Sequence, residues 1–416
     1  MRQGSGLSHR MSKRFDVVIV GAALNGLAAG LALGGQRTRR PLSVAIVDGV
    51  DPFQRVASSR DARASALTSS ARRMFEVLGV WQHIAQQTQD MREIVVTDGE
   101  PVLLQFGDVN EGQRSTACMV ENHVLLGGLL KEVGQSPCLT LVTGAAVSGQ
   151  HFGPGLARLD LANGEQLTAS LIVAADGGKS PIRQAANIEF VGWSYDQVAL
   201  VASFAHELPH HGRAEEHFTA SGPFAVLPLA GNRSSIVWTQ GTEAGKRLQE
   251  LPPGDFETEL QLRLGAHLGK ITLIGRQQGY PLSMLFAKEF HGPRLALVGD
   301  AAHVIHPLAG LGLNLGLRDA AALAECVGEA HALGQDIGGP EVLERYSAWR
   351  RFDTVATAAA MDGINRLFSN DNLFLRIVRD FGLQAANRMG GLKQAFEREA
   401  AGETGTLPRL LRGEMI

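Results

Sequence analysis

Three short segments of the sequence combine glycine with a carboxylate or a helix start, and each follows an apolar run of strand type. They are residues 21–26, Asp176-Gly177 and Gly299-Asp300. Glycine lets a ligand or another stretch of backbone approach closely, and the N–H groups at a helix start favour negative charge. A carboxylate beside them can accept hydrogen bonds from sugar hydroxyl groups. This combination predicts a nucleotide site.

The segment 21–26 matches the G-x-G-x-x-G dinucleotide fingerprint, except that Ala23 replaces the middle glycine. Gly21 allows the tight turn after the strand, and Gly26 allows close packing of the following helix. Asp48 ends a second predicted strand, where it can accept a hydrogen bond from a ribose hydroxyl. The adenosine half of such a site does not separate FAD from NAD. The alternative is an ordinary strand–helix–strand unit without a nucleotide.

The second segment ends a predicted strand, and a helix is expected from about Ser180, with Pro181 in its first turn. Taken alone, this pattern fits any strand-to-helix turn. The third segment ends a predicted strand at 295–298 and precedes a glycine-rich loop and an apolar helix expected from about Leu313. Arg63 lies in a stretch that we interpret as a loop feeding an amphipathic helix, where its guanidinium is either a phosphate contact or a solvated charge.

The histidines offer little chemistry of their own. No carboxylate or cysteine stands at ligand spacing from His303 and His306, so we predict no metal site. We interpret both as packed or hydrogen-bonded side chains, with a catalytic base role, first for His306, as the alternative. The stretch 207–217 is interpreted as a solvated turn.

The elements that must position these segments change along the chain. Strand-like runs at 197–205, 222–230 and 234–240 predict an antiparallel sheet inserted between nucleotide-binding parts. Such a sheet can wall a pocket for an apolar substrate, or it can serve structure or dimerisation. The last third, about 313–400, is predicted helical, and the apolar face of 371–383 is interpreted as core packing, with membrane or partner contact as the alternative.

Bulk properties exclude several classes of protein. The chain has 416 residues, 44% of them hydrophobic and 19% charged, which is enough for a large core. A net charge of −3 gives no reason to expect nucleic acid. The three cysteines are too few and too scattered for a disulfide framework, which favours a reducing cytoplasm. The apolar run 17–33 could just span a membrane by length, but its glycine and asparagine indicate strand, turn and buried helix.

The order of the three glycine-containing segments resembles that of the FAD-dependent aromatic hydroxylases, similar to p-hydroxybenzoate hydroxylase. Finer details look like the branch that hydroxylates the ring during ubiquinone biosynthesis. The motifs that carry this resemblance are DARASAL, MVENHVLL, AADGGKSPIR, GPFAVLPL, GDAAHVIHPLAGLGLNLGLRDA and RLFSN.

The resemblance implies an α/β fold: a discontinuous Rossmann-like FAD-binding domain, an inserted antiparallel β-sheet substrate domain and a helical C-terminal region. The implied boundaries place FAD-binding parts at 15–75, 116–185 and 286–345, substrate-domain parts at 76–115 and 186–285, and the helical region at 346–416.

The resemblance also assigns roles at the cofactor. Asp300 would contact the ribityl–pyrophosphate part of FAD, Asp48 the adenosine ribose, and Arg63 FAD or its pyrophosphate. The loop 307–314 would lie against the isoalloxazine, where its N–H groups favour negative charge near the N1–C2=O edge. Asp176-Gly177 would serve both FAD and NAD(P)H. The full set of expected cofactor-binding residues is Gly21, Ala22, Ala23, Gly26, Asp48, Arg63, Asp176, Gly177, Gly299, Asp300, Pro307, Gly310, Gly312, Leu313 and Asn314.

Two positions depart from the pattern of that branch. Ala23 replaces a glycine in the first turn, and Leu311 stands where the branch usually has glutamine. Leu311 removes a polar group beside the flavin, which leaves the ring position attacked and the rate of flavin reduction open.

The implied activity is that of an FAD-dependent monooxygenase. NAD(P)H would reduce FAD, O₂ would give a C4a-hydroperoxyflavin, and its distal oxygen would pass to the ring of a polyprenylated phenol in ubiquinone biosynthesis. The expected location is cytoplasmic, with peripheral membrane association or membership of a biosynthetic complex left open. Two other functions stay open: hydroxylation of a small soluble aromatic compound, and a non-catalytic flavin-binding subunit.

Overall fold

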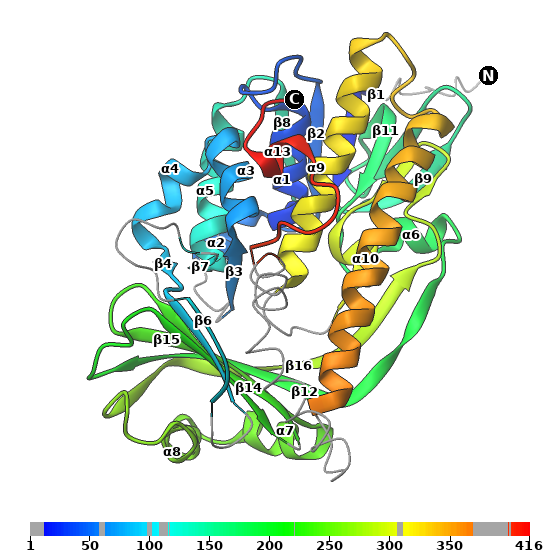
Figure 1. Ribbon diagram of the computed structural model, residues 1–416. Coiled ribbons are helices and arrows are strands. Elements are labelled where there is room, and N and C mark those ends of the chain that lie inside the picture. The colour runs from blue at the N-terminus through cyan, green and yellow to red at the C-terminus, as the bar shows by residue number, and fades with distance from the viewer. Residues whose placement is uncertain are drawn as a thin grey trace, which may run out of the picture.

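The structure is a computed structural model, and it describes residues 12–57, 63–97, 102–107, 115, 117–219, 221–305, 311–368, 398 and 401–416. Figure 1 shows an α/β body that carries both described chain ends, above a large twisted sheet with helices on its lower side. The sequence predicts this fold class, and the structure confirms it. The run at 17–33 is a strand followed by a buried helix.

The α/β body is built on a sheet with the strand order β17-β18-β11-β1-β2-β8. Strands β18, β11, β1, β2 and β8 run parallel to one another, and the apolar runs of the first four are buried on both faces, as is typical of parallel sheets. The strands of this sheet are β1 (Ser12–Val20), β2 (Val44–Asp48), β8 (Leu139–Thr143), β9 (Val147–Phe152), β10 (Ala157–Leu161), β11 (Gln166–Ala174), β17 (His291–Gly292) and β18 (Leu295–Leu297).

Helices pack on this sheet and on one another, with α9 against α1 and α10 against α9. Their apolar residues join one continuous core with the strands. The helices of the body are α1 (Leu24–Gly34), α2 (Pro52–Ala57), α3 (Ser69–Leu78), α4 (Trp81–Ile84), η1 (Ala85–Gln87), α5 (Asn122–Gln135), α6 (Pro181–Ala185), η2 (Gly299–Ala301), α9 (Leu311–Ala332), α10 (Pro340–Phe368) and α13 (Arg409–Arg412).

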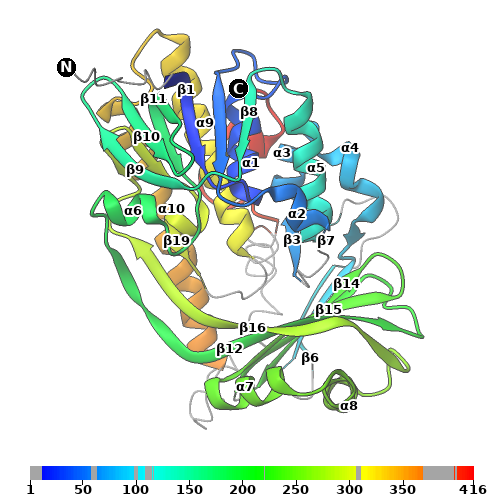
Figure 2. The same cartoon turned by 180° about the vertical axis from the view of Figure 1, so that it is seen from behind.

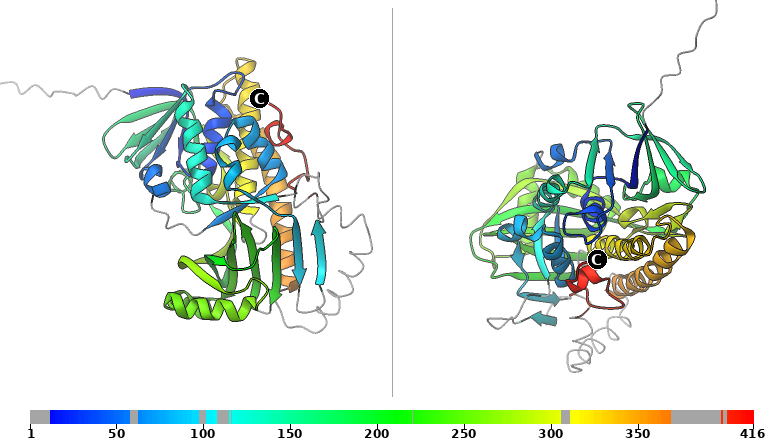
Figure 3. Two further views of the ribbon diagram at one scale, coloured as in Figure 1. Left: turned by 90° about the vertical axis from the view of Figure 1, so that its left-hand side faces the viewer. Right: turned by 90° about the horizontal axis from the view of Figure 1, so that it is seen from above.

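The second sheet is mostly antiparallel, with the order β19-β16-β12-β15-β14-β13-β5-β6 and one parallel pair, β13 with β5. Helices α7 (Thr242–Glu250) and α8 (Pro253–Leu264) pack on its outer face, away from the α/β body (Figure 3). Its strands are β5 (Glu93–Thr97), β6 (Val102–Gly107), β12 (Phe190–His206), β13 (Arg213–Thr219), β14 (Gly222–Leu229), β15 (Arg233–Gly241), β16 (Ile271–Ala287) and β19 (His303–Val304).

Strands connect the two bodies. The 17-residue strands β12 and β16 run side by side from the α/β body into the second sheet (Figure 2). A small sheet of β3 (Ala64–Thr68), β7 (Ala117–Glu121) and β4 (Gln89–Asp90) lies between the two bodies, where Arg233 of β15 pairs with Glu121 of β7 at 3.0 Å.

Two local predictions are wrong. Residues 64–68 form strand β3 instead of a loop, because they pair with β7, which lies about fifty residues further along the chain. The second half of the predicted solvated turn is strand β13, and Glu215 within it is buried. The stretch has the charged composition of a solvated turn, but in the fold its charged side chains pair with one another and with His267. The predicted face at 371–383 lies outside the described residues.

Candidate cofactor and active site

The three glycine-containing segments meet at one edge of the parallel sheet. Strands β18, β11 and β1 are adjacent and parallel, so their carboxyl ends carry Asp300, Asp176 and Gly21 to the same side. A Cβ added at Gly21 would lie 2.3 Å from the carbonyl oxygen of Ala175, which shows how closely two of these turns approach. Ligands of open α/β sheets bind at this edge.

The first turn needs glycine at two positions. Gly21 has a φ of +110°, and a Cβ at Gly26 would lie 1.9 Å from the carbonyl oxygen of Gly21. Ala23 is different: it is the N-cap of α1 with a φ of −97°, a conformation open to any residue, and it is exposed. The turn therefore forms without the middle glycine.

Asp48 fastens this turn to the end of β2. Its Oδ2 atom accepts a hydrogen bond from the N–H of Ala22 at 2.8 Å. Its Oδ1 atom accepts from the N–H of Val50 at 2.9 Å and from Arg55 at 3.0 Å. The carboxylate thus stands at the mouth of the turn, where a ribose hydroxyl would meet it.

Asp176 precedes the short helix α6. Its Oδ2 atom lies 3.4 Å from the N–H of Ile182, and the hydroxyl of Ser180 caps the helix. Burial raises the pKa of Asp176, against the lowering effect of the Ser180 hydroxyl. Its Oδ1 atom is buried without a hydrogen-bond partner within the described part of the chain. Gly177 follows with a φ of +89° and open space around the position of a Cβ.

The charge of Arg63 acts on the Asp300 carboxylate at this edge of the sheet. The Asp300 carboxylate is exposed although protein surrounds it closely; burial raises its pKa, while His303 and Arg63 lower it. The Arg63 guanidinium also lies over the ring of Tyr280 in β16, 5.5 Å from its centre. Residues from both bodies therefore converge at the carboxyl end of β18.

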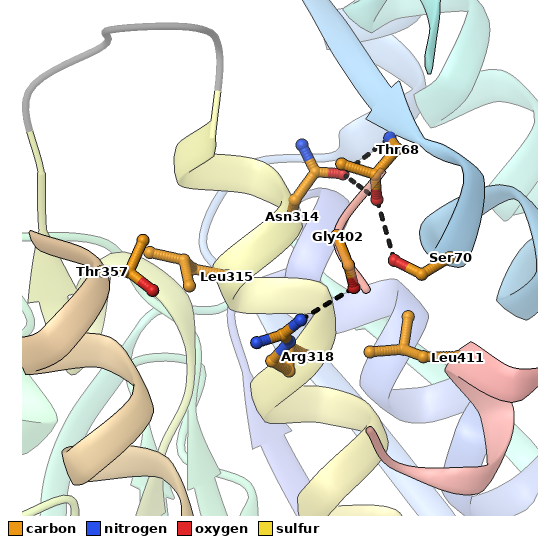
Figure 4. Close-up of a pocket in the computed structure, with 8 residues that line it drawn as sticks. All are labelled: Thr68, Ser70, Asn314, Leu315, Arg318, Thr357, Gly402 and Leu411. Carbon is orange, nitrogen blue, oxygen red and sulfur yellow. Dashed lines mark hydrogen bonds between the residues drawn. The ribbon is translucent and has the colours of Figure 1, made fainter. Parts of the chain in front are cut away.

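Helix α9 begins at Leu311, two residues earlier than predicted, with Gly312 in its first turn. The Asn314 side chain is bonded within the protein: its Nδ2 donates to the carbonyl of Ala66 at 2.7 Å, and its Oδ1 accepts from Thr68 (Figure 4). That side chain anchors α9 to β3, which leaves the backbone N–H groups of the first turn to face a ligand. Residues 306–310, which include His306, Pro307 and Gly310, lie outside the described residues.

A buried polar network supports the end of β18 from behind. Asp319 of α9 accepts hydrogen bonds from the N–H of Gly299 at 3.0 Å, from His303 at 2.6 Å and from Arg350 of α10 at 2.8 Å. Asp319 and Arg350 have no exposed side-chain surface. His303 is therefore a hydrogen-bonded side chain inside the protein. This agrees with the interpretation of His303 as a packed or hydrogen-bonded residue.

These features fit FAD. Close backbone approach at Gly21 and Gly26 suits a pyrophosphate, and the carboxylates of Asp48 and Asp300 suit hydroxyl groups at the two ends of a dinucleotide. The unpartnered Oδ1 of Asp176 suits a further donor.

Comparison with known proteins identifies the family. The FAD binding domain family matches residues 14–361, which is most of the chain. The chain belongs to this family. The predicted cofactor FAD and the predicted family are thereby confirmed for this FAD-binding-domain protein.

Its relatives span nearly its whole length. The FAD-binding-domain protein is 40% identical to the ubiquinone hydroxylase UbiL of Rhodospirillum rubrum, over 96% of this chain and 92% of that one. It is 33% identical to the 3-demethoxyubiquinol 3-hydroxylase of Escherichia coli, over 93% and 98%. The p-nitrophenol 4-monooxygenase of Pseudomonas putida has the same fold, with a TM-score of 0.79, 17% identity and coverage of 95% and 100%.

The sequence analysis of this FAD-binding-domain protein missed two site features. One is Asn25, whose amide would lie 2.4 Å from a Cβ at Gly299 and 2.1 Å from a Cβ at Gly316. The other is the Asp319–Arg350 pair. The available signal was Asp319 itself, a charge within the otherwise apolar stretch that follows the glycine-rich loop, because a charge on a buried helix face needs a partner.

Proposed function

We propose that this protein is an FAD-dependent monooxygenase that hydroxylates the aromatic ring of a polyprenylated phenol in ubiquinone biosynthesis, with NAD(P)H as reductant and O₂ as oxidant. The observation that carries the proposal is the convergence of Gly21, Asp176 and Asp300 at one sheet edge in a chain that matches ubiquinone hydroxylases over nearly its full length.

The protein's own groups would position and polarise the cofactor. Gly21, Ala22, Ala23 and Gly26 would hold the pyrophosphate at the start of α1, and Asp48 the adenosine ribose. When bound, FAD supplies the hydride and oxygen chemistry.

The groups on the other strand ends would act at the flavin end. Asp300 and Arg63 would hold the ribityl and pyrophosphate groups with opposite charges. Backbone N–H groups of Gly312 and Leu313 would stabilise negative charge on the flavin ring without the cost of reorienting water.

The inner face of the second sheet would wall the substrate pocket. Its residues Val201, Val237 and Ala225 form an apolar surface across three neighbouring strands. Exclusion of water there would strengthen every charge interaction at the ring.

We also propose that the protein takes its substrate from a membrane surface. Of the helices that the structure describes, none combines the length and the apolar character needed to cross a bilayer. Val355 of α10 and Trp193 of β12 are 51% and 41% exposed, and both line a recess of about 500 Å³. Exposed apolar groups that gather in this way are typical of contact surfaces. Binding to liposomes that is lost in Val355→Ser and Trp193→Ser would support this; equal binding would count against it.

The decisive experiment is quinone extraction from a strain in which this gene is deleted. Aerobic growth should lead to accumulation of a polyprenyl phenol that lacks one ring hydroxyl, detected by liquid chromatography and mass spectrometry. The missing group identifies the carbon attacked. Normal ubiquinone in a strain without a second hydroxylase would overturn the proposal.

A further inference from the structure

The strand pairing places Glu216 of β13 on the inner face of the second sheet, toward the FAD-binding body. Side chains alternate between the two faces of a strand. Glu215 lies on the outer face, because its partner Val226 belongs to the core under α8. Glu216 pairs with Ala225 and with Val96, so these three residues lie in one row on the opposite face.

This row runs across six neighbouring strands of the sheet. From β16 to β5 its members are Gln278, Val201, Val237, Ala225, Glu216 and Val96. The row has apolar residues on three central strands, which span roughly 10 Å and are flanked by Gln278 on one side and Glu216 on the other. An apolar strip of that width between two polar side chains suits a substituted aromatic ring.

The rows on either side both contact residues outside the second sheet, on the side of the FAD-binding body. In one, Ala214 and Leu227 pack against Ala66 and Met119 of the small sheet. In the other, Tyr280 lies under the guanidinium of Arg63. The row of Glu216 therefore faces the FAD-binding body between two points of contact.

The side chain of Glu216 has no hydrogen bond or ion pair with any part of the chain that the structure describes, although the residue is only partly exposed. Burial raises the pKa of Glu216 to about 7. Its inner-face neighbours Ala225 and Val96 on the adjacent strands cannot titrate, and neither can Ala214 or Phe218 on β13 itself.

No charge on another group contributes to this shift. Tyr280, with Arg63 over its ring, lies on β16, four strands away from β13 in the second sheet. Glu215 and His217 lie on the outer face. A half-buried carboxylate without a partner is costly to maintain in a fold unless a ligand uses it.

We propose that Glu216 is a catalytic residue that accepts the proton of the substrate's phenolic hydroxyl. This inference rests on the proposed function, since it assigns the group that meets the phenol. The phenol O–H bond breaks as an O–H bond forms on the Glu216 carboxylate, and the electron pair left on oxygen delocalises into the ring. The ring carbons ortho and para to that oxygen become more electron-rich, which favours oxygen insertion there. The step moves one proton and needs no oxidant or reductant.

The test uses full-length protein loaded with FAD and 2-farnesylphenol as the substrate probe. Wild-type hydroxylation should rise with pH through about 7, where Glu216 becomes ionised. In Glu216→Gln the rate of hydroxylation should fall roughly 10²-fold, the usual contribution of a general base, and this inflection should vanish. Flavin reduction by NAD(P)H should stay unchanged. Glu216→Asp should recover the inflection with part of the rate.

Binding gives a second readout. Raising the pH through 7 should change the affinity for 2-farnesylphenol in the wild type and leave the affinity for its methyl ether constant, because the ether has no proton to give. In Glu216→Gln the affinity for both ligands should be independent of pH. Glu243→Gln, a control on α7 with 89% of its side chain exposed, should match the wild type throughout.

The outcomes separate the two proposals. If the wild type hydroxylates the probe and Glu216→Gln keeps its rate and pH profile, Glu216 is not the base while the proposed function stands. If the FAD-loaded wild type hydroxylates no prenyl phenol, both fail.

Discussion

The Nε2 atom of His303 lies 2.6 Å from Oδ2 of Asp319, and both side chains are buried. The same oxygen accepts the N–H of Gly299, and the other carboxylate oxygen accepts Nε of Arg350. One buried carboxylate thus links the end of β18 to α9 and α10. The residue that follows Gly299 is Asp300, so this network fixes where Asp300 stands.

Replacing Asp319 by asparagine should destabilise the protein by about 3–5 kcal/mol, because it leaves the buried Arg350 charge without its partner. Denaturant unfolding measures this. Glu414→Gln, which breaks an exposed pair with Arg412, should cost less than about 1 kcal/mol. Equal losses in the two variants would show that the network does not stabilise the fold.

The same carboxylate makes stability depend on acid. Burial raises the pKa of Asp319, but His303 and Arg350 outweigh it, and the pKa lies below its ordinary value. A carboxylate whose pKa is lower in the folded state stabilises that state fully above its unfolded pKa. This stabilisation is lost as pH falls through its folded pKa. Unfolding midpoints of the wild type should therefore drop more steeply below pH of about 4 than those of Asp319→Asn.

Asp300→Ala should purify largely without flavin while it stays folded, since the carboxylate is expected to hold FAD and has no part in the core. Absorbance of the flavin relative to protein, together with circular dichroism, measures both. Asp196→Ala on β12, also an exposed carboxylate, should keep its yellow colour. Full flavin occupancy of Asp300→Ala would remove Asp300 from the cofactor site.

Substitutions at Gly26 and at Ala23, both in the first turn, should differ in their effect. Gly26→Ala should lose FAD and stability, because its Cβ would lie 1.9 Å from a backbone oxygen. Ala23→Gly should change FAD affinity by less than about tenfold, since Ala23 already has an ordinary backbone conformation. Flavin fluorescence titration of the apoprotein compares them. A large gain in affinity for Ala23→Gly would mean that the Ala23 methyl group obstructs the phosphates.

The stabilisation that His267 gives the folded state should be lost at alkaline pH. Its Nε2 lies 3.4 Å from Glu215, and that hydrogen bond raises the pKa of His267 above 6.5. A histidine whose pKa is raised by folding stabilises the folded state fully below its unfolded pKa. This stabilisation is lost as pH rises through its folded pKa. The wild type should lose more stability than His267→Gln between pH of about 6 and 9, by less than about 1 kcal/mol since the ring is partly exposed. Parallel slopes in urea unfolding would contradict this.

Leu311→Gln should alter the rate of flavin reduction or the ring position hydroxylated. Position 311 is the first residue of α9. A glutamine amide there would add a polar group beside the flavin, if the flavin lies where the proposed function places it. Stopped-flow reduction by NAD(P)H and product analysis report the two effects separately. Unchanged kinetics with an unchanged product would make Leu311 a neutral difference from its relatives.

Much of the site could be predicted because its signals are local. Gly21, Asp176 and Asp300 each follow an apolar run, and backbone constraints alone assign glycine or a carboxylate to such places. Strand β3 could not be predicted in this way, since Ala64–Thr68 has small residues and gains its order from pairing with β7. The domain boundaries and the individual cofactor contacts remain predictions.

The burial of charged residues could not be predicted where their partners lie far away in the sequence. The carboxylate of Glu215 depends on His267, which follows α8, and that of Asp319 depends on Arg350 in another helix. Neither partner has a fixed spacing in sequence. The same limit hid Glu216, whose face is decided by its pairing with β14 and β5.

The spread of the cofactor site along the chain constrains how the protein is made. Strands β1, β11 and β18 end at residues 20, 174 and 297, so each adjacent pair closes a loop of more than a hundred residues. Such non-local pairing slows folding and delays it until distant segments exist. On the ribosome, the nascent chain would present the Gly21 turn long before Asp300 has emerged, and a chain cut short before β18 would lack one wall of the site. Flavin capture is therefore an event of the finished chain.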